Sequence, residues 1–260
     1  MSGEVMVFDS GLGGLTVLAA LRRAAPALDC LYVADDAGFP YGDYANDELT
    51  DHVVATVSGL INKYRPVMVV IACNSASTLV LGHLRGHFDL PFVGTVPAIK
   101  PAAASTRSGL VSVLATPGTV ERDYTRALIS DHGGDASITL VGCPNLARLA
   151  EAAMSGGKSD NSEIAREIAP AFIRQGEAMT DQVVLACTHY PLLTEALAAA
   201  APWPVAWVDP APAIARRAVD VLGTVSGTGE CRFIATSRAD IDELAGRVLE
   251  RLIDSGHAAI

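Results

Sequence analysis

One pattern, a buried strand ending in Ala-Cys, occurs twice in this chain and limits its fold more than any other feature. Residues 69–77 read VVIACNSAS, and residues 183–191 read VVLACTHYP. Continuous runs of β-branched and apolar residues are typical of strands in a parallel sheet that is covered on both faces. Ligands of open α/β sheets bind beyond the carboxyl ends of such strands. The pattern therefore predicts two strand-end thiols, Cys73 and Cys187, each followed by hydroxyl-bearing residues.

Two further strand-and-turn segments recur in the same order around this pattern. Residues 9–14 correspond to 114–119, and residues 91–98 correspond to 204–211. This predicts an α/β fold with two similar βαβ-built domains, mainly parallel sheets, a pseudo-two-fold relation and an active site in the cleft between them. We expect residues 1–96 plus 210–260 to form the first domain and 97–209 the second, because the last strand and helix follow the final repeat.

Composition and charge restrict the class of protein further. The chain has 260 residues, half of them hydrophobic, and a formal net charge of −10. An acidic balance without a basic block repels phosphate backbones, so we expect no nucleic-acid partner. The five cysteines are widely spaced without a Cys-x-x-Cys motif, which disfavours a disulfide framework. Because no signal-peptide or membrane-spanning pattern appears, we expect a cytoplasmic protein without membrane association.

The glycine-rich turn after the first predicted strand allows two interpretations. The pattern Gly11-x-Gly13-x-x-Thr16, with Asp35 after the next strand, partly resembles a dinucleotide-binding fingerprint. The third glycine is missing, however. Asp9 and Ser10 precede the glycines and supply a carboxylate and a hydroxyl. They favour the second interpretation, a turn that binds a small ligand.

The cysteines also leave alternatives open. They can be inert core residues, as single buried cysteines commonly are. A Cys/His hydrolase would use Cys187 with His189, but we expect these two side chains at the strand end to point in different directions. A protein that only binds an amino acid would need neither thiol. His83 and His87 have i, i+4 spacing without a third ligand nearby, so we expect no metal site.

Four motifs together resemble the cofactor-independent aspartate/glutamate racemase family, and its glutamate racemase branch in particular. They are FDSGLGGL at 8–15, FPYG at 39–42, ACNSAS at 72–77 and ACTHYPL at 186–192. They span nearly the whole chain in the family's order. Ser75 stands where the family usually has Thr, which puts the side-chain fit of the substrate in doubt. Ala186 stands where Gly is common.

The resemblance implies an amino-acid racemase that acts on glutamate, with aspartate or another acidic amino acid as the alternative substrate. It implies no cofactor, a homodimer, and a role in supplying D-glutamate for peptidoglycan. The implied catalytic residues are Cys73, Cys187, Asp9, His189 and Glu151. The implied substrate-binding residues are Asp9, Ser10, Tyr41, Gly42, Asn74, Ser75, Thr116, Thr119, Thr188 and His189.

The residue types suit this chemistry. Racemisation removes the α-proton, a very weak acid, and returns a proton to the opposite face. Two thiols on opposite faces do this without moving the substrate, one as thiolate base and the other as thiol acid. A free cysteine has a pKa of about 8.5, so each sulfur needs a positive or hydrogen-bonding neighbour.

Some members of this family carry an N-terminal extension connected with activation by a cell-wall precursor. The first predicted strand here begins at Val5, which leaves no such extension in this sequence. We therefore expect activity without a nucleotide-sugar activator.

Overall fold

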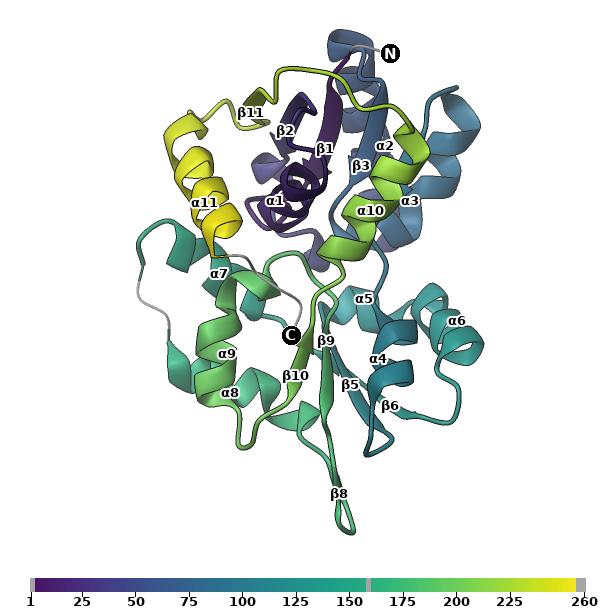
Figure 1. The fold of residues 1–260 in the computed structure, drawn as a ribbon, viewed down its shortest axis with the longest axis vertical. Coiled ribbons are helices and arrows are strands. Elements are labelled where there is room, and N and C mark those ends of the chain that lie inside the picture. The colour runs from purple at the N-terminus through teal and green to yellow at the C-terminus, as the bar shows by residue number, and fades with distance from the viewer. Residues whose placement is uncertain (1–2, 158–159, 256–260) are drawn as a thin grey trace. The chain divides into compact units, whose positions relative to one another are not determined.

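The computed structural model describes residues 3–157 and 160–255. Within these residues the chain forms two compact units (Figure 1). Residues 3–95 and 211–255 form the first, and residues 96–157 and 160–210 form the second. The sequence-based boundaries, after residues 96 and 209, differ by one residue at each crossing.

The first unit is built on a five-stranded sheet whose neighbouring strands all run parallel. Its order is β11-β2-β1-β3-β4. The strands are β1 (Val5–Asp9), β2 (Cys30–Ala34), β3 (Met68–Ile71), β4 (Phe92–Gly94) and β11 (Cys231–Ala235). Every residue of β1, β2 and β3 is buried, which explains their continuous apolar sequences.

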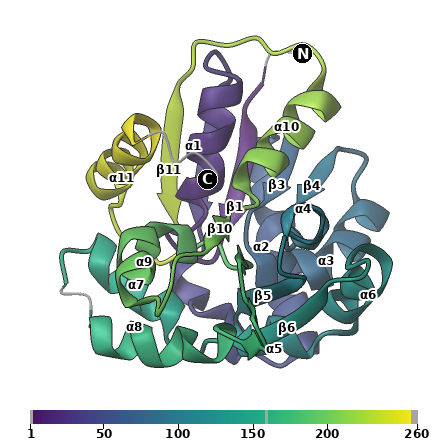
Figure 2. The same ribbon diagram turned by 60° about the horizontal axis from the view of Figure 1, so that its bottom comes forward.

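Helices cover both faces of this sheet. They are α1 (Leu15–Ala24), α2 (Asn46–Tyr64), α3 (Asn74–His87), α10 (Ala211–Leu222) and α11 (Asp242–Asp254), with 3₁₀ turns η1 (Asp36–Gly38) and η2 (Tyr41–Asp43). Helices α2 and α3 share one core with alternate residues of β1, β2 and β3, such as Phe8, Val33 and Ile71. Helix α1 packs against α10 and α11 (Figure 2).

The second unit has a four-stranded parallel sheet of order β10-β9-β5-β6. Its strands are β5 (Leu110–Ala115), β6 (Ser137–Gly142), β9 (Gln182–Leu185) and β10 (Ala206–Val208), beside the small hairpin β7 (Arg174–Gln175) and β8 (Ala178–Met179). Its helices are α4 (Ile99–Ser105), α5 (Pro117–Glu121), α6 (Asp123–His132), α7 (Leu146–Met154), α8 (Asn161–Ile168) and α9 (Thr194–Ala200), with 3₁₀ turns η3 (Ala169–Ala171) and η4 (Tyr190–Leu193). Helices α4 and α6 lie on one side of the sheet, and α7, α8 and α9 on the other (Figure 1).

The two sheets share one topology. The order β2-β1-β3-β4 in the first corresponds to β6-β5-β9-β10 in the second, so each Ala-Cys strand occupies the same place. The first sheet has one extra strand, β11, which pairs with β2. The predicted α/β class with two parallel sheets is confirmed, and the tail returns to the first unit as its sequence position suggested.

Helix α3 begins at Asn74, directly after Cys73, which is its extended N-cap residue. The segment from Pro117 to His132 forms two helices, α5 and α6. Arg122 separates them with the extended dihedral angles φ −74° and ψ 138°.

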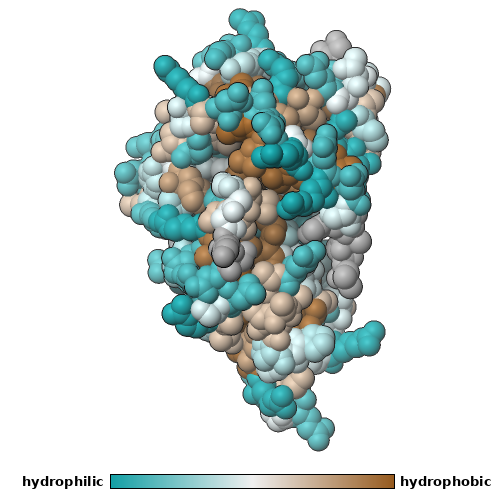
Figure 3. Space-filling model, turned by 90° about the vertical axis from the view of Figure 1, so that its left-hand side faces the viewer, coloured by the Kyte–Doolittle hydropathy of each residue, from teal (hydrophilic) through white to brown (hydrophobic). Residues whose placement is uncertain are grey.

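The molecular surface is mostly polar on the face in Figure 3, where hydrophilic side chains project and hydrophobic residues show in patches between them. Among the described residues, no helix combines the length and the apolar character needed to cross a membrane.

Burial of the central strands predicts a matched pair of stability effects. Val70 on β3 is fully buried, whereas Val96 is 36% exposed. Val70→Ala removes two buried methyl groups and leaves a cavity, so it should lower the free energy of unfolding by about 2 kcal/mol. Val96→Ala should change it by less than about 0.5 kcal/mol. Urea denaturation followed by circular dichroism measures both, and equal losses would contradict this description of the core.

Candidate functional site

The first candidate thiol, Cys73, follows β3 and is the N-cap residue of α3. It is 5% exposed. A helix N-terminus carries partial positive charge from its unpaired N–H groups, which favours a thiolate over a thiol. The strand-end position predicted for Cys73 therefore also places its sulfur where negative charge is stabilised.

Asp9 and Ser10 reach the same sheet edge because β1 and β3 are parallel neighbours, with Phe8 opposite Ile71. The Cys73 Sγ donates to the Ser10 Oγ at 3.7 Å. Asp9 is fully buried and accepts a hydrogen bond from the backbone N–H of Gly11 at 3.1 Å. A Cβ on Gly14 would lie 2.5 Å from the Asp9 Cβ, so the glycine-rich turn is needed to accommodate this carboxylate.

Asn74, the residue after Cys73, has an unusual side chain. It is 2% exposed, and neither its Oδ1 nor its Nδ2 has a hydrogen-bond partner in the structure. A buried amide without partners costs about 1–3 kcal/mol, so such a group is retained where a ligand satisfies it. Ser75 follows and is also buried. These residues form a polar surface beside the Cys73 thiol.

A buried hydrogen-bond network around Asp35 was not expected from the sequence. Asp35 accepts hydrogen bonds from the Tyr41 hydroxyl, from the Thr236 Oγ1 at 2.6 Å, and from the His52 Nε2 at 2.6 Å. This carboxylate is fully occupied by side chains, which disfavours its role as a ribose-binding acid. Burial and the Asp35 charge raise the pKa of Tyr41, so its hydroxyl keeps its proton. Gly42, beside it, is half-buried.

The network brings together the end of β2, helix α2 and the end of β11. Thr236 lies 201 residues from Asp35 in the sequence. No local spacing could have identified this pair; an acid at the carboxyl end of a buried strand was the only available signal.

The second candidate thiol, Cys187, follows β9 and is 7% exposed. Its Sγ lies 3.8 Å from the Nδ1 of His189. The sequence argument that these two side chains diverge is wrong. Side chains two apart on a strand lie on the same face, so the argument would have failed even within a strand. The strand also ends at Leu185, and His189 has the helical dihedral angles φ −76° and ψ −29°.

His189 is held on its other side by Glu151 of α7, whose Oε1 lies 2.7 Å from the His189 Nε2. Burial is the largest single influence on the pKa of His189 and lowers it. The hydrogen bonds and negative charges of Cys187 and Glu151 together outweigh burial and raise that pKa well above its ordinary value. An imidazolium between a sulfur and a carboxylate stabilises negative charge on the sulfur.

Three threonines complete the polar group in the second unit. Thr116 lies at the end of β5, which pairs with β9 through Leu114 and Leu185. Its Oγ1 donates to the Thr119 Oγ1 at 3.0 Å. Thr188 is buried, with its Oγ1 3.5 Å from the His189 Nδ1. A hydroxyl residue thus follows the strand beside each Ala-Cys strand, Ser10 in the first unit and Thr116 in the second.

Cys143, His83 and His87 also carry reactive or metal-binding side chains, and each has contacts of its own. Burial raises the pKa of Cys143, and its backbone oxygen accepts from the Tyr190 hydroxyl at 3.2 Å. The Nδ1 of His87 lies 2.7 Å from the backbone oxygen of His83. Within residues 3–157 and 160–255, no cluster of three or more potential metal ligands occurs.

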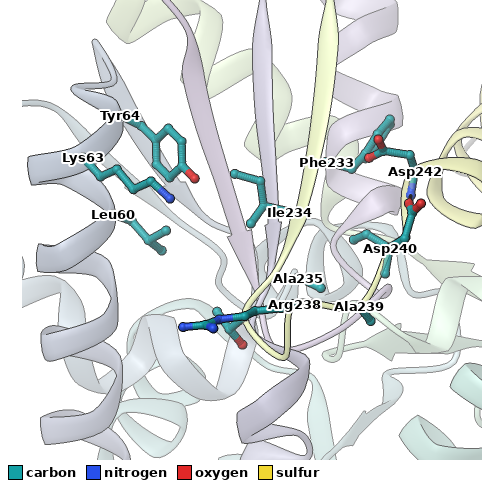
Figure 4. A pocket seen from close by; sticks show the side chains of 12 residues that line it. Leu60, Lys63, Tyr64, Phe233, Ile234, Ala235, Arg238, Ala239, Asp240 and Asp242 are labelled. Carbon is teal, nitrogen blue, oxygen red and sulfur yellow. Dashed lines mark hydrogen bonds between the residues drawn. The ribbon is translucent and has the colours of Figure 1, made fainter.

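A surface hollow of about 490 Å³ lies in the first unit beside the edge strand β11 (Figure 4). Its lining combines Leu60, Lys63 and Tyr64 of α2 with residues 233–236 and 238–242. None of the predicted site residues lines it.

Comparison with known proteins places this geometry in context. Residues 13–218 match the model of the Asp/Glu/hydantoin racemase family. The chain is 55% identical to a glutamate racemase of Brucella anthropi, over 84% of this chain and 79% of that protein. It is 49% identical to a glutamate racemase of Mesorhizobium japonicum, over 95% of each.

The fold of this chain is also similar to that of a solved structure. It is Escherichia coli glutamate racemase in complex with L-glutamate and the activator UDP-MurNAc-Ala, with a TM-score of 0.87 and 38% sequence identity. The match covers 97% of this chain and 96% of that one.

The His189 contacts predict a pH-dependent signal. Because its pKa is raised in the folded state, His189 stabilises the fold fully below pH about 6.5, and the contribution is lost as pH rises through the raised value. Glu151→Gln should lower the titration midpoint of His189 by about 1–2 pH units. NMR of labelled histidine measures this midpoint.

Glu167→Gln is the matched control, because Glu167 contacts Asn145 in the same unit. An equal midpoint in wild type and Glu151→Gln would show that the carboxylate does not hold the proton on His189.

Proposed function

Because this chain belongs to the Asp/Glu/hydantoin racemase family, we propose that it is a glutamate racemase, an isomerase that interconverts L- and D-glutamate. The observation that carries the proposal is the equivalent placement of Cys73 and Cys187 at the ends of corresponding strands in two sheets of one topology. The names of relatives about half identical to this chain support glutamate as the substrate.

In the proposed reaction, the two thiols act on opposite faces of one substrate. Cys73, as thiolate, takes the α-proton of D-glutamate, while Cys187, as thiol, gives its proton to the other face of Cα. The roles reverse with L-glutamate. This requires both thiols to reach a single bound amino acid.

Each sulfur has its own means of holding negative charge. For Cys73 it is the N-terminus of α3, with Asp9 as the proposed assisting group. Ser10 accepts a hydrogen bond from the Cys73 thiol, and its hydroxyl can donate to the sulfur once the thiol has lost its proton. For Cys187 it is His189, supported by Glu151. The two arrangements differ in charge, so we expect the two directions of proton transfer to respond differently to changes in pH.

General acid–base catalysis supplies only about 10²–10⁴-fold, so charge on the carbanionic transition state needs further stabilisation. The Asn74 amide supplies an unused donor and acceptor for the substrate. The Tyr41 hydroxyl donates its hydrogen bond to Asp35, so its oxygen is left to accept from the substrate ammonium. We assign further substrate contacts to Ser10, Gly42, Ser75, Thr116, Thr119, Thr188 and His189.

Aspartate or another acidic amino acid is the second candidate substrate. The motivating observation is Ser75, a buried residue directly after Asn74 that lacks the methyl group of threonine. Loss of a methyl keeps the hydroxyl and changes the space around the substrate side chain, so this position bears on chain length rather than on proton transfer.

Further parts of the proposal concern cellular context. A glutamate racemase supplies D-glutamate for peptidoglycan, and we propose this role, a cytoplasmic location and a homodimer on the strength of the family alone. Activity without a nucleotide-sugar activator stays a prediction, to be set against the activator-bound Escherichia coli relative.

The proposed function predicts cofactor-free racemisation. Purified protein, dialysed against chelator, should convert either enantiomer of glutamate to the other, with aspartate much slower. In deuterated water, product formed early should carry deuterium at Cα while remaining substrate carries little, because the two faces use different bases. Chiral chromatography with mass detection measures both quantities.

Adding zinc or pyridoxal phosphate is the control. Activity that appears only after such an addition would contradict the cofactor-free proposal. Faster turnover of aspartate than of glutamate would favour the second candidate substrate.

A further inference from the structure

Two cysteines outside the candidate site form a pair in the first unit. Cys30 is the first residue of β2, and Cys231 is the first residue of β11. The two strands are parallel neighbours, and these two residues lie directly opposite each other in the register. Neighbouring strands are about 4.8 Å apart, within the Cα separation of about 4.4–6.8 Å that a disulfide requires.

The side chains of this pair lie on one face of the sheet. Two residues further along, Tyr32 and Phe233 are also register partners, and their ring centroids are 6.3 Å apart. Side chains two apart on a strand share a face, so the two sulfurs lie on the face of this aromatic pair. The Cys30 Sγ donates to the backbone oxygen of Leu28 at 3.7 Å, and each of the two thiols shifts the pKa of the other.

The backbone around the pair is fixed. The Asp29 carboxylate accepts hydrogen bonds from the backbone N–H groups of Thr228 and Glu230, at 2.9 and 3.0 Å. The Cys30 N–H donates to the Glu230 carbonyl at 2.8 Å. These contacts join the residues before β11 to the beginning of β2, so the backbones that carry the two cysteines are held beside each other.

The two sulfurs differ in exposure and in charge. Cys30 is fully buried, whereas Cys231 is partly exposed. The neighbouring Cys30 thiol lowers the pKa of Cys231, and nearby Arg22 lowers it further against the effect of burial. The Cys231 thiol and burial raise the pKa of Cys30. A partly exposed cysteine of lowered pKa beside a second thiol is the arrangement found at oxidation-sensitive cysteines.

We propose that Cys30 and Cys231 are a redox modification site, which hydrogen peroxide converts to a reversible intrachain disulfide. The Cys231 thiolate attacks one peroxide oxygen, so that an S–O bond forms, the O–O bond breaks and hydroxide leaves. The sulfur is oxidised to a sulfenic acid and the peroxide is reduced. The Cys30 sulfur then loses its proton and attacks the Cys231 sulfur; the S–S bond forms, the S–O bond breaks, and water is released.

Peptide mapping of the full-length protein tests this site without any dependence on racemisation. The reduced protein is treated with hydrogen peroxide, blocked with iodoacetamide and digested with trypsin without reductant. Cleavage at Arg23, Lys63, Arg217 and Arg232 gives residues 24–63 and 218–232, with one cysteine in each. We expect these two peptides to be linked, and dithiothreitol to separate them.

Cys30→Ala is the informative variant, because Cys231 then lacks its resolving thiol. The sulfenic acid at Cys231 should persist and react with dimedone, giving about tenfold more label than in wild type. Cys231→Ala should give no linked peptide and leave Cys30 reduced. Cys143, whose pKa is raised by burial, is the internal control and should stay reduced.

Two results would overturn the proposal in the wild-type protein itself, whether or not the variants fold. One is a Cys231 that remains open to iodoacetamide after peroxide has oxidised other thiols. The other is a Cys231 that links only to a second chain or proceeds to the sulfinic acid.

Discussion

The parallel pairing of each Ala-Cys strand with its neighbour is the constraint on which the rest of the candidate site depends. Parallel strands end at one edge of a sheet, so β1 and β3 deliver Asp9, Ser10 and Cys73 to the same place. Strands β5 and β9 do the same for Thr116 and Cys187. A shift of register by one residue would turn these side chains toward the other face of the sheet. Burial of β3 and β9 therefore determines the register of these strands and, with it, the positions of the candidate site residues that follow them.

The two units stabilise charge at their thiols by different physical means. In the first, the N-terminus of α3 provides positive potential, while Asp9 stands nearby as a buried carboxylate. In the second, His189 provides a cation whose proton is secured by Glu151. The two sheets thus share one topology, but the groups near their cysteines differ in charge. In the proposed two-thiol mechanism, each thiol would alternate between acid and base in its own electrostatic surroundings.

The fold and most candidate residues could be predicted because they depend on local patterns. Buried strands ending in Ala-Cys identify both thiols, and repeated segments identify the common topology of the sheets. The Asp35 network could not be predicted, since Thr236 and His52 reach that carboxylate only through packing of separate elements. The contact between Cys187 and His189 was predicted wrongly because side chains two apart on a strand share a face and do not diverge. The strand also ends at Leu185, before either residue.

The most direct test of the central claim is the turnover of Cys73→Ala and Cys187→Ala with each enantiomer of glutamate. Each direction needs one thiolate and one thiol, so either substitution should abolish racemisation both ways, by at least about 10²–10⁴-fold. Glutamate binding, measured by calorimetry, should persist because other residues hold the charged groups. If either variant keeps near wild-type turnover, that cysteine is a structural residue and the two-thiol mechanism is wrong.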